Sequence, residues 1–589
     1  MVANKWKVNK SWRSQGVHHE RGADLASELC CSRVLADLLI NRGIDSPSTA
    51  ETFLNPNLGD LHDPDLLPGM ADAVQRITEG IRKGETMAVV GDYDVDGIAS
   101  TALLLEFFRF IDRPVRHYIP HRLRDGYGIN DSVVRNLAEE GVSLIITVDN
   151  GSTAIAAADA AHALGVDLVV TDHHLPGDEL PRARAIVNPC LHGSEYPFRK
   201  LAGVGVTFKV VWALCRAFSR SRKVTPEFRR FMVDALAFVA LGTIADVVPL
   251  RDENRILARY GLRALESAET AGLRHLVALA KRGDHGRVLD AEDVGFRIAP
   301  CLNAAGRLDD AEQALSLLLC RDESEAGRLL GVLKRHNEKR RDIEREIYED
   351  ARDSILSELD MEGDRVVVLA REGWHPGVIG IVASRLVEEF FRPTLLISLE
   401  GEIGKGSARS IPQVEICEAL RRSRDCLESF GGHAMAAGVR IASNRVEDLR
   451  QTLNRVVDVR PGEMIPEVVV DGEYSLSSWT IDAVRELQRL APFGEGNPRP
   501  RFAIRGAEIV GQPRLMGNDQ SHLSFFVRQH EDTALRAVAF RKADWHAALL
   551  ERDVSVSLVY QPSLNRWRDR ESLELLVDEI DISSSTVAQ

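Results

Sequence analysis

The sequence predicts an α/β protein in which a parallel-sheet domain is joined by one long helix to a second α/β domain, followed by a small β-barrel. Three observations favour this fold class. Short apolar runs alternate with helical stretches between residues 86 and 188, residues 332–357 contain neither Gly nor Pro, and about five short β runs follow residue 465. A chain of 589 residues is long enough for about three to five domains.

The first α/β stretch alternates strands and helices. Short apolar strands separated by helices pair in parallel, and the sheet they form is covered on both faces. We expect strands at Met87–Val90, Leu144–Val148, Leu168–Thr171 and Ala185–Val187, and helices at Ala99–Arg109 and Ala154–Leu164. Functional groups of such sheets gather at the carboxyl ends of the strands.

The sequence pattern of the remaining chain changes twice. A mostly helical part, 203–359, ends in one predicted helix over Glu325–Ser357, whose mixed charges are typical of a solvated connector. A second α/β segment follows, with strands at Arg365–Ala370 and Thr394–Ser398 around a helix at Val378–Phe390. Barrel strands are expected at Arg501–Ile509, His522–Arg528, Leu535–Phe540, Val554–Tyr560 and Leu573–Val577. The predicted regions are 1–80 (an N-terminal region without assigned chemistry), 81–320, 321–360 (the connecting helix), 361–460 and 461–589.

Composition excludes several classes of protein. With 44% hydrophobic and 28% charged residues, the chain can bury cores and is not disordered throughout. Its formal charge of −14 means that any nucleic-acid site must gather basic residues in a groove. No secretory signal, membrane-length apolar run or CxxC pair is visible, so we expect a soluble, cytoplasmic protein without structural zinc or disulfides.

Acidic residues and histidines follow three successive predicted strands. The strands run into Gly91-Asp92-Tyr93-Asp94-Val95-Asp96-Gly97, Asp149-Asn150-Gly151 and Asp172-His173-His174, and a further Asp, Asp246, follows an apolar helical run. Carboxylates at every second position repel one another unless a cation lies among them. The set therefore predicts a metal site at one edge of the sheet.

Each segment also has an ordinary interpretation. Asp92-x-Asp94-x-Asp96-Gly97 resembles the start of a calcium loop, but the Glu expected at loop position 12 is replaced by Leu103. Asp-Asn-Gly is the composition of a common turn, and paired histidines are often surface or core residues. Their combination at one sheet edge favours a metal centre. Carboxylates with imidazole suit Mn²⁺ or Mg²⁺, two ions being the usual arrangement for phosphoester hydrolysis.

At these residues the sequence resembles the DHH phosphoesterase superfamily, named for the motif at Asp172-His173-His174. Within it, the chain resembles the RecJ family of 5′→3′ exonucleases specific for single-stranded DNA. The matching motifs run in order from about residue 80 to the C-terminus. They include Asp125-Gly-Tyr-Gly128, Leu201-Ala-Gly-Val-Gly205, Leu302-Asn-Ala-Ala-Gly-Arg307, Gly373-Trp-His-Pro-Gly377, Phe430-Gly-Gly-His433 and Ala491-Pro-Phe-Gly-Glu-Gly-Asn-Pro498.

This resemblance implies roles for the residues at the sheet edge. The metal ligands would be Asp94, Asp96, Asp149, His173 and Asp246, with Asp149 bridging two ions. His174 would contact the scissile phosphate, and Asp172 would orient the imidazoles. Asp92 lies near a position where other members of the superfamily have a His ligand, and we treat it as a supporting residue and candidate ligand.

The resemblance also assigns the other regions. The second α/β segment resembles a DHHA1 substrate-binding domain, and Gly404-Lys-Gly-Ser-Ala-Arg-Ser410 is expected to be a loop that binds a phosphate through backbone N–H groups and an arginine. The implied substrate-binding residues are Arg122, Asn303, Arg307, Lys405, Ser407, Arg409, His433 and Trp567. Arg122, Ser407 and Arg409 would hold a 5′-terminal phosphate, and His433 would help to close the site.

The C-terminal barrel resembles an OB-fold, which holds single strands on aromatic side chains beside a positive groove. Phe525, Phe526, Tyr560 and Trp567 are candidates for base stacking. Because side chains alternate along a strand, some of the four must lie in the barrel core. The segment Asn565-Arg-Trp-Arg-Asp-Arg570 is the one favoured for DNA contact.

The expected function is metal-dependent 5′→3′ degradation of single-stranded DNA to mononucleotides in repair and recombination. We expect a monomer that can act with a single-strand binding protein and a helicase. Two alternatives stay open. One is a DHH phosphoesterase acting on oligoribonucleotides, cyclic dinucleotides or pyrophosphate, although such enzymes usually lack the barrel. The other is a non-catalytic DNA-binding scaffold, although every matched ligand position is filled.

Overall fold

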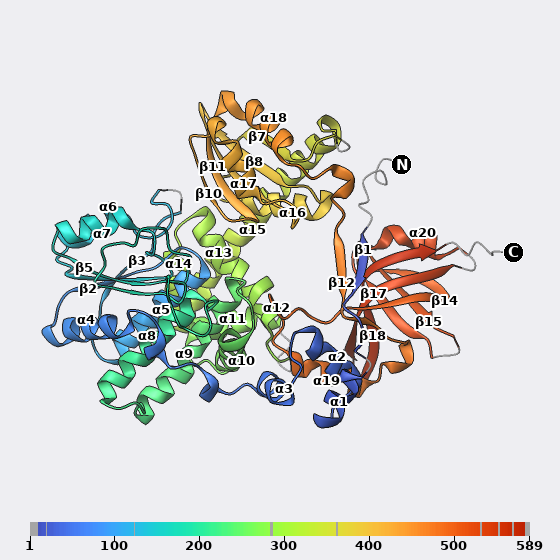
Figure 1. The fold of residues 1–589 in the computed structure, drawn as a ribbon, viewed down its shortest axis with the longest axis horizontal. Helices are drawn as coiled ribbons and strands as arrows, with labels where there is room; N and C mark the ends of the chain where they lie inside the picture. Colours follow the sequence, from blue (N-terminus) through green and yellow to red (C-terminus); the bar gives the residue numbers. More distant parts are fainter. Residues whose placement is uncertain are drawn as a thin grey trace. The chain divides into compact units, whose positions relative to one another are not determined.

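The computed structural model describes residues 10–18, 20–122, 124–282, 287–360, 363–530, 533–551, 554–567 and 570–583. The chain divides into two compact units (Figure 1). The first contains residues 61–249 and 253–466. The second contains residues 10–60 and 250–252 and the described part of 467–589. The predicted fold class, two α/β domains joined by a long helix and followed by a barrel, is confirmed.

The first sheet contains five parallel strands in the order β3-β2-β4-β5-β6. They are β2 (Met87–Val90), β3 (Arg116–Tyr118), β4 (Leu144–Val148), β5 (Asp167–Thr171) and β6 (Ala185–Val187). The strand β3 lies at the sheet edge and carries Arg, His and Tyr rather than an apolar run, which explains why the sequence pattern did not predict it. Thr147 pairs with Val90, and Val148 pairs with Thr171. This register places the carboxyl ends of β2, β4 and β5 at one edge.

Helices cover both faces of this sheet. The helices α6 (Asp131–Glu139) and α7 (Ile155–Ala163) pack on one face through Val, Leu and Ala side chains. The opposite face carries α4 (Met70–Lys83), α5 (Val95–Phe110) and α8 (Gly203–Ser219) (Figure 1). With apolar helices on both sides, every residue of β2 and β4 is buried.

A helical region continues the first unit. It contains α9 (Pro226–Ala245), α10 (Asp252–Glu266), α11 (Ala271–Lys281), α12 (Ala291–Asp293), a π-helical turn η3 (Val294–Ile298), α13 (Ala299–Leu308) and α14 (Glu312–Leu319). The long predicted helix is present as α15 (Glu323–Glu358), whose 36 residues span about 54 Å. It packs on α11, α13 and α14 in its first half and on α16 in its second.

The second sheet of this unit has the order β10-β11-β9-β8-β7. Its strands are β7 (Val367–Glu372), β8 (Thr394–Glu400), β9 (Ile403–Arg409), β10 (Ser429–Gly432) and β11 (Ala436–Ala442), with helices α16 (Ile379–Phe390), α17 (Ile416–Arg422) and α18 (Val446–Val456). β7 and β8 are parallel, whereas the other pairings are antiparallel.

The expectation of a phosphate-binding loop at 404–410 is wrong, because residues 404–409 belong to β9. This strand pairs with β8 on one side and β11 on the other, so its backbone N–H groups serve the sheet. Its small residues have a packing reason. A Cβ at Gly404 would lie 2.7 Å from Ile397 Cγ2, and one at Gly406 would lie 2.6 Å from Val439 Cγ2.

The second unit is built on a closed barrel of β13 (Gly472–Glu473), β14 (Phe502–Met516), β15 (His522–Arg528), β16 (Leu535–Ala539), β17 (Ser555–Trp567) and β18 (Arg570–Ser583). The strand order is β13-β14-β15-β16-β18-β17, and pairing of β14 with β17 closes it. Several strands are longer than predicted, because alternation of polar and apolar residues along a two-sided strand hides its ends. The short helix α20 (His546–Leu549) packs on β14.

N-terminal residues are part of this second unit. The strand β1 (Ser11–Ser14) pairs in parallel with β12 (Glu467–Val470). The helices α1 (Arg21–Glu28), α2 (Arg33–Asn41) and α3 (Pro47–Leu54) share a core with the barrel and with α19 (Ile481–Leu487). Residues 250–252 join the same unit, where the Leu250 N–H donates to Glu495 O at 2.7 Å. None of the described helices is long and apolar enough to cross a membrane.

Candidate active site

The sheet edge predicted from the sequence brings together its acidic and histidine residues. Three groups of ligand atoms lie close enough to share an ion: Asp149 with His173 and His174, Asp96 with His173 and Asp246, and Asp92 with Asp94 and Asp149. Within each group, the atoms lie within 4.8 Å of one another. The structure thus brings together every residue that the sequence predicted to be a metal ligand.

Local structure positions the first two carboxylates. Asp94 is the N-cap residue of α5, and its Oδ1 accepts from the N–H groups of Asp96 and Gly97 at 3.0 and 3.1 Å. Asp96, in the first turn of that helix, is fully buried. Its two oxygens accept from the first N–H groups of α8, those of Gly203 and Val204, at 2.8 and 2.9 Å. A helix N-terminus is the natural partner of such a buried carboxylate.

Asp149 and His173 face each other with unused hydrogen-bonding atoms. Asp149 stands directly after β4 in the left-handed region, at φ +62°, and is 2% exposed. Its Oδ1 lies 3.2 Å from His173 Nε2, and both atoms are buried without a hydrogen-bond partner. A divalent cation would satisfy both, because a carboxylate oxygen and a neutral imidazole nitrogen are lone-pair donors.

The protonation behaviour of the carboxylates also fits a site that binds a cation. Burial and the neighbouring Asp94 raise the pKa of Asp92 to about 8 and that of Asp96 to about 7. Burial, together with Asp96 and Asp94, raises the pKa of Asp246 to about 9 and raises that of Asp149 far above its ordinary range. Anionic oxygens packed in this way need positive charge among them. The residues present therefore fit a site for divalent cations.

The two histidines have opposite electrostatic surroundings. Burial and the charge of His174 lower the pKa of His173 to about 4, which leaves its ring neutral and able to bind a metal. Burial would also lower the pKa of His174, but the hydrogen bond from its Nδ1 to Asp172 Oδ1, 2.8 Å long, outweighs burial and raises the pKa to about 9. Asp172 itself is held at a pKa of about 2; burial opposes this shift, but the His174 bond and charge outweigh it.

Asp172 orients the ring of His174 and the backbone near His173. Its side chain bonds the His174 ring and also accepts from the backbone N–H groups of His173 and Ser152, at 2.7 and 2.9 Å. The His173 ring is instead held by a hydrogen bond to the backbone of Leu201.

Tyr127 belongs to this site, although the sequence pattern gave it no role. Its hydroxyl donates to Asp149 O at 2.9 Å and lies 3.0 Å from His174 Nδ1. The phenol is 47% exposed, so it lies at the mouth of the site. The only sequence signal was its position in Asp125-Gly-Tyr-Gly128, since an isolated Tyr carries no pattern.

Three guanidinium groups gather beside the carboxylates. Burial, together with the charges of Arg122, Arg340 and Arg409, lowers the pKa of Arg307 to about 10. Burial and the charge of Arg122 also lower the pKa of Arg409. Among the described residues, Arg122, Arg307 and Arg409 form no ion pair with a carboxylate. Such a group of like charges is typical of a site that receives an anion.

Neighbouring elements fix the positions of these arginines. Arg122 lies over the Tyr93 ring, 4.8 Å from its centroid, and Arg307 Nη1 donates to Gly377 O at 3.2 Å. Arg409 Nη1 donates to Ser407 Oγ at 3.0 Å. Gly380 in the first turn of α16 leaves room for that pair, because a Cβ there would lie 2.9 Å from Ser407 Oγ.

The other residues predicted to bind substrate lie on different elements, and some of them are exposed. Lys405, Ser407 and Arg409 alternate along β9 and share one face, with Lys405 exposed. Asn303 lies one turn before Arg307 on α13. His433 is exposed just after β10, and its backbone N–H donates to Ala436 O at 2.8 Å; no contact links its ring to the arginines.

In the barrel unit, two of the aromatic candidates for base stacking are core residues. Phe525 and Tyr560 are 1% and 0% exposed, and the Tyr560 hydroxyl accepts from Trp479 Nε1 at 2.7 Å. Phe526, the next residue along β15, is 48% exposed. Trp567 ends β17, where its backbone pairs with Arg570; its side chain and Arg568 lie outside the described residues.

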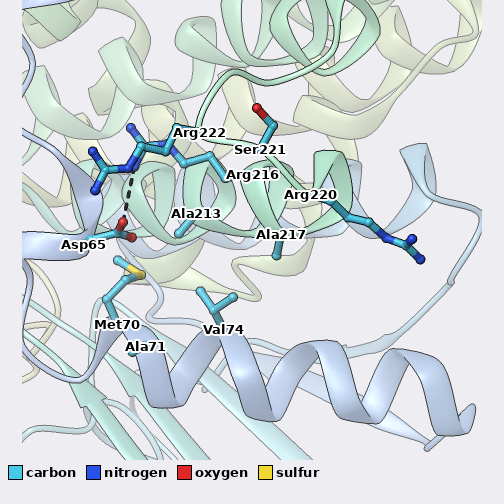
Figure 2. A pocket seen from close by; sticks show the side chains of 10 residues that line it. All are labelled: Asp65, Met70, Ala71, Val74, Ala213, Arg216, Ala217, Arg220, Ser221 and Arg222. Carbon is cyan, nitrogen blue, oxygen red and sulfur yellow. Dashed lines mark ion pairs between the residues drawn. The ribbon is translucent and has the colours of Figure 1, made fainter.

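A separate pocket of about 400 Å³ lies at the C-terminal end of α8 (Figure 2). Its lining combines Met70 and Val74 of α4 with Arg216 and Arg220. Arg216 Nη1 already pairs with Asp63 at 2.6 Å and with Asp65 at 3.6 Å. About fourteen helical residues, roughly 20 Å, separate this pocket from the α8 N-terminus at the carboxylates, so it is not part of the candidate active site.

Comparison with known proteins agrees with this geometry. Family models match the chain at residues 86–243 (DHH family, N-terminal domain), 363–458 (DHHA1 domain) and 470–579 (RecJ OB domain). The single-stranded-DNA-specific exonuclease RecJ of Bacillus subtilis is 37% identical over 99% of this chain and 72% of its own length. The chain belongs to the RecJ family.

Two further RecJ proteins extend the comparison. That of Escherichia coli is 35% identical over 95% of this chain and 97% of its own length. The crystal structure of RecJ from Thermus thermophilus in complex with Mn²⁺ superimposes with a TM-score of 0.82 at 30% identity, covering 98% of this chain and 80% of that one. The same protein in complex with Mg²⁺ gives a TM-score of 0.76. This RecJ has thus been solved with Mn²⁺ and with Mg²⁺, the two kinds of ion that the carboxylate and imidazole ligands of this chain predict.

Proposed function

We propose that this protein is a metal-dependent exonuclease that degrades single-stranded DNA from the 5′ end to mononucleotides and serves DNA repair and recombination. One observation carries the proposal: a buried carboxylate and imidazole cluster with unused ligand atoms lies beside three guanidinium groups of the same unit that, in the described part of the chain, form no ion pair with a carboxylate. A cation site next to an anion site is what hydrolysis of a phosphodiester near a terminal phosphate requires. RecJ relatives with that named activity support the choice of substrate.

Five residues would hold the cations: Asp94, Asp96, Asp149, His173 and Asp246, with Asp149 shared between two ions. Asp92, buried behind them, would support the set. When bound, two divalent cations supply an activated water and stabilise negative charge on the leaving oxygen. The four carboxylates among the ligands balance the charge of two divalent cations.

His174 would bind the phosphate between the nucleotides. With a pKa of about 9, its ring carries a proton at neutral pH, and Asp172 accepts the hydrogen bond from Nδ1. The Nε2–H would then be a charged donor for a non-bridging phosphate oxygen. The Tyr127 hydroxyl lies 3.0 Å from Nδ1 and 3.3 Å from Nε2 of the same ring, so it helps Asp172 to orient the ring before substrate arrives.

The arginine cluster would bind the 5′-terminal phosphate. Arg122, Arg307 and Arg409, together with the Ser407 hydroxyl, offer many N–H and O–H donors to one anion. A dianionic phosphate would relieve the mutual repulsion that lowers the pKa of Arg307. Anchoring the terminal phosphate would place the first phosphodiester at the cation site, which accounts for both the 5′ polarity and the release of mononucleotides.

The barrel unit would hold the strand beyond the first nucleotides. OB-folds bind single strands by stacking bases on aromatic side chains, and the β17–β18 hairpin that carries Trp567 is the proposed contact. We further propose that the protein acts as a monomer in the cytoplasm and receives its single strands from a helicase and a single-strand binding protein.

A timed digestion tests the proposal. An internally labelled 40-mer is supplied as a single strand and as a blunt duplex, each with Mn²⁺, with Mg²⁺ and with chelator. We expect mononucleotides from the 5′ end of the single strand only, and only with metal. An intact 40-mer beside rapid hydrolysis of dinucleotides or pyrophosphate would instead favour a small-substrate phosphoesterase. Metal-independent DNA binding without hydrolysis under any condition would favour a scaffold.

A further inference from the structure

A fully buried side chain outside the carboxylate cluster bridges two backbone segments, one that borders the cluster and one that carries Asp246. Asn254, in the first turn of α10, is 0% exposed. Its Nδ2 donates to Lys200 O at 2.7 Å and to Pro249 O at 3.1 Å. Its Oδ1 accepts from the Ala202 N–H at 3.3 Å. Both amide hydrogens are therefore used, one on each segment.

The first of these segments, residues 200–202, leads into the site from one side. Ala202 is the N-cap residue of α8, and the next two N–H groups, from Gly203 and Val204, hold Asp96. Gly203 also lies against Asp149, since a Cβ there would stand 2.8 Å from Asp149 Cγ. The backbone of Leu201 bonds the His173 ring. Three of the five proposed metal ligands thus depend on where this segment lies.

The second segment, residues 246–249, carries a fourth proposed metal ligand, Asp246. Asp246 ends α9, and the chain turns through Val247 at φ +59°. A β-branched residue in the left-handed region is strained and keeps that conformation only where its surroundings determine it. Val247 is 65% exposed, so its own side chain gives little restraint. The hydrogen bond from Asn254 to Pro249 O holds the turn from its far side.

We infer that Asn254 is a positioning residue that sets the distance between Asp246 and the group formed by Asp96, Asp149 and His173, and so sets the affinity of the site for divalent cations. The required chemistry explains the residue type. Two carbonyls and one N–H meet at this point, and a short side chain with two donors and an acceptor is a carboxamide. The inference rests on the proposed metal site, although it does not depend on the substrate.

The neighbouring Glu253 keeps this bridge rigid. It is fully buried and pairs with Lys209 of α8 at 2.5 Å, while its second oxygen accepts from Tyr196 at 2.6 Å. The first turn of α10 therefore binds α8 twice, once at its N-cap residue Ala202 through Asn254 and once at Lys209, in its second turn, through Glu253. With α8 fixed, any movement allowed by loss of Asn254 falls on residues 200–202 and 246–249.

The test compares Asn254→Asp and Asn254→Ser with a matched control, Asn454→Asp. Asn454 makes the same kind of bridge away from the site: it accepts from the N–H groups of Arg365 and Val366 and donates to the carbonyls of Val366 and Arg450. Aspartate at either position removes two donors and adds a negative charge, which is fully buried at 254 and half-buried at 454. Serine at 254 is too short to reach both carbonyls, and it keeps the residue neutral.

Mn²⁺ binding to the metal-free full-length protein is titrated by electron paramagnetic resonance, without DNA. Replacing residues that hold metal ligands in place commonly weakens metal affinity by about 10–100-fold. We expect a loss of at least about tenfold for both Asn254 variants, and less than twofold for Asn454→Asp. High Mn²⁺ should restore nuclease activity of Asn254→Ser to near the wild-type rate.

Three results would overturn the inference. The first is wild-type Mn²⁺ affinity in folded Asn254→Ser. The second is an equal loss in the Asn454 control. The third is a loss of activity in Asn254→Ser that high Mn²⁺ does not restore. Far-ultraviolet circular dichroism identifies an unfolded variant, and Asn254→Ser decides the matter if the aspartate variant does not fold. Failure of the wild-type protein to bind Mn²⁺ would refute the proposed metal site itself, whereas binding of Mn²⁺ without DNA cleavage would refute only the proposed substrate.

Discussion

Adding one methyl group at Gly203 should disable the site without removing any functional group. A Cβ at this position would clash with Asp149 Oδ1, and it would stand 2.8 Å from Asp149 Cγ and 2.9 Å from Asp149 Cβ. Ordinary contacts begin at 3.4 Å, so the carboxyl group or the start of α8 must move by at least about 0.6 Å. Because Asp149 is the proposed shared ligand, its displacement should disturb both cation positions.

The expected magnitude follows from this displacement. A misplacement of 1 Å can cost about 100-fold in rate, so Gly203→Ala should lower the turnover rate by about 10- to 100-fold. The cost in stability should be small. Overpacking costs about 1–3 kcal/mol, and Ala is favoured over Gly within a helix by about 1 kcal/mol. The Gly203 N–H, which binds Asp96, is retained in the variant.

The assay is the initial rate of mononucleotide release from a single-stranded 40-mer at saturating Mn²⁺, alongside thermal unfolding of the metal-free protein. The control is Gly327→Ala in α15, where a Cβ would make only an ordinary contact, 3.4 Å from His275 Cε1. It should keep the wild-type rate. A Gly203→Ala rate within twofold of wild type would refute the reasoning, because the close approach of α8 to Asp149 would then not matter.

Three further predictions concern the cations, the terminal phosphate and pH. Asp149→Ala should abolish cleavage but keep binding of single-stranded DNA in a filter assay; a wild-type rate would remove Asp149 from the site. Arg409→Ala should lose most of its preference for 5′-phosphorylated over 5′-hydroxyl ends, measured as a ratio of rates, whereas Lys405→Ala, on the exposed end of the same strand face, should keep more of it. The pKa of Asp96 and Asp246 is raised in the folded protein by burial and neighbouring carboxylates. A carboxyl group with a raised pKa holds its proton more tightly in the folded than in the unfolded protein. Its contribution to stability is therefore complete below about pH 4 and is lost as the pH rises to about 9. The melting temperature of the metal-free protein should therefore fall between pH 6 and pH 9, and Mn²⁺ should reverse the fall; a flat profile would contradict these shifts.

Several parts of this protein follow from local sequence. The strands β2, β4, β5 and β6 were predicted within a residue of their observed ends, because a strand buried on both faces is an unbroken apolar run. The long helix α15 was predicted because neither Gly nor Pro interrupts it. The metal site was also predictable, since parallel strands end at one edge and the residues directly after them must meet there.

Other parts had no local signal. The sequence of β9 predicts a loop, because Gly and Ser are typical of turns, whereas here Gly404 and Gly406 leave space for Ile397 and Val439. Phe525 and Phe526 are adjacent in the sequence, yet one is core and the other exposed, and only the barrel register determines which. The helices α1–α3 pack on a barrel more than 400 residues later in the chain.

The sequence by itself therefore determined which residues could bind cations and phosphate, since that depends on side-chain chemistry and on the ends of strands. Tertiary structure alone decided how those residues behave. The N–H groups of α8 bind Asp96, and the Asp172 side chain binds the ring of His174 rather than that of His173. Arg122, Arg307 and Arg409 come together from distant segments. The physical reason is that the charge state and orientation of a buried group depend on neighbours that fold closure brings together, and no short-range pattern encodes these neighbours.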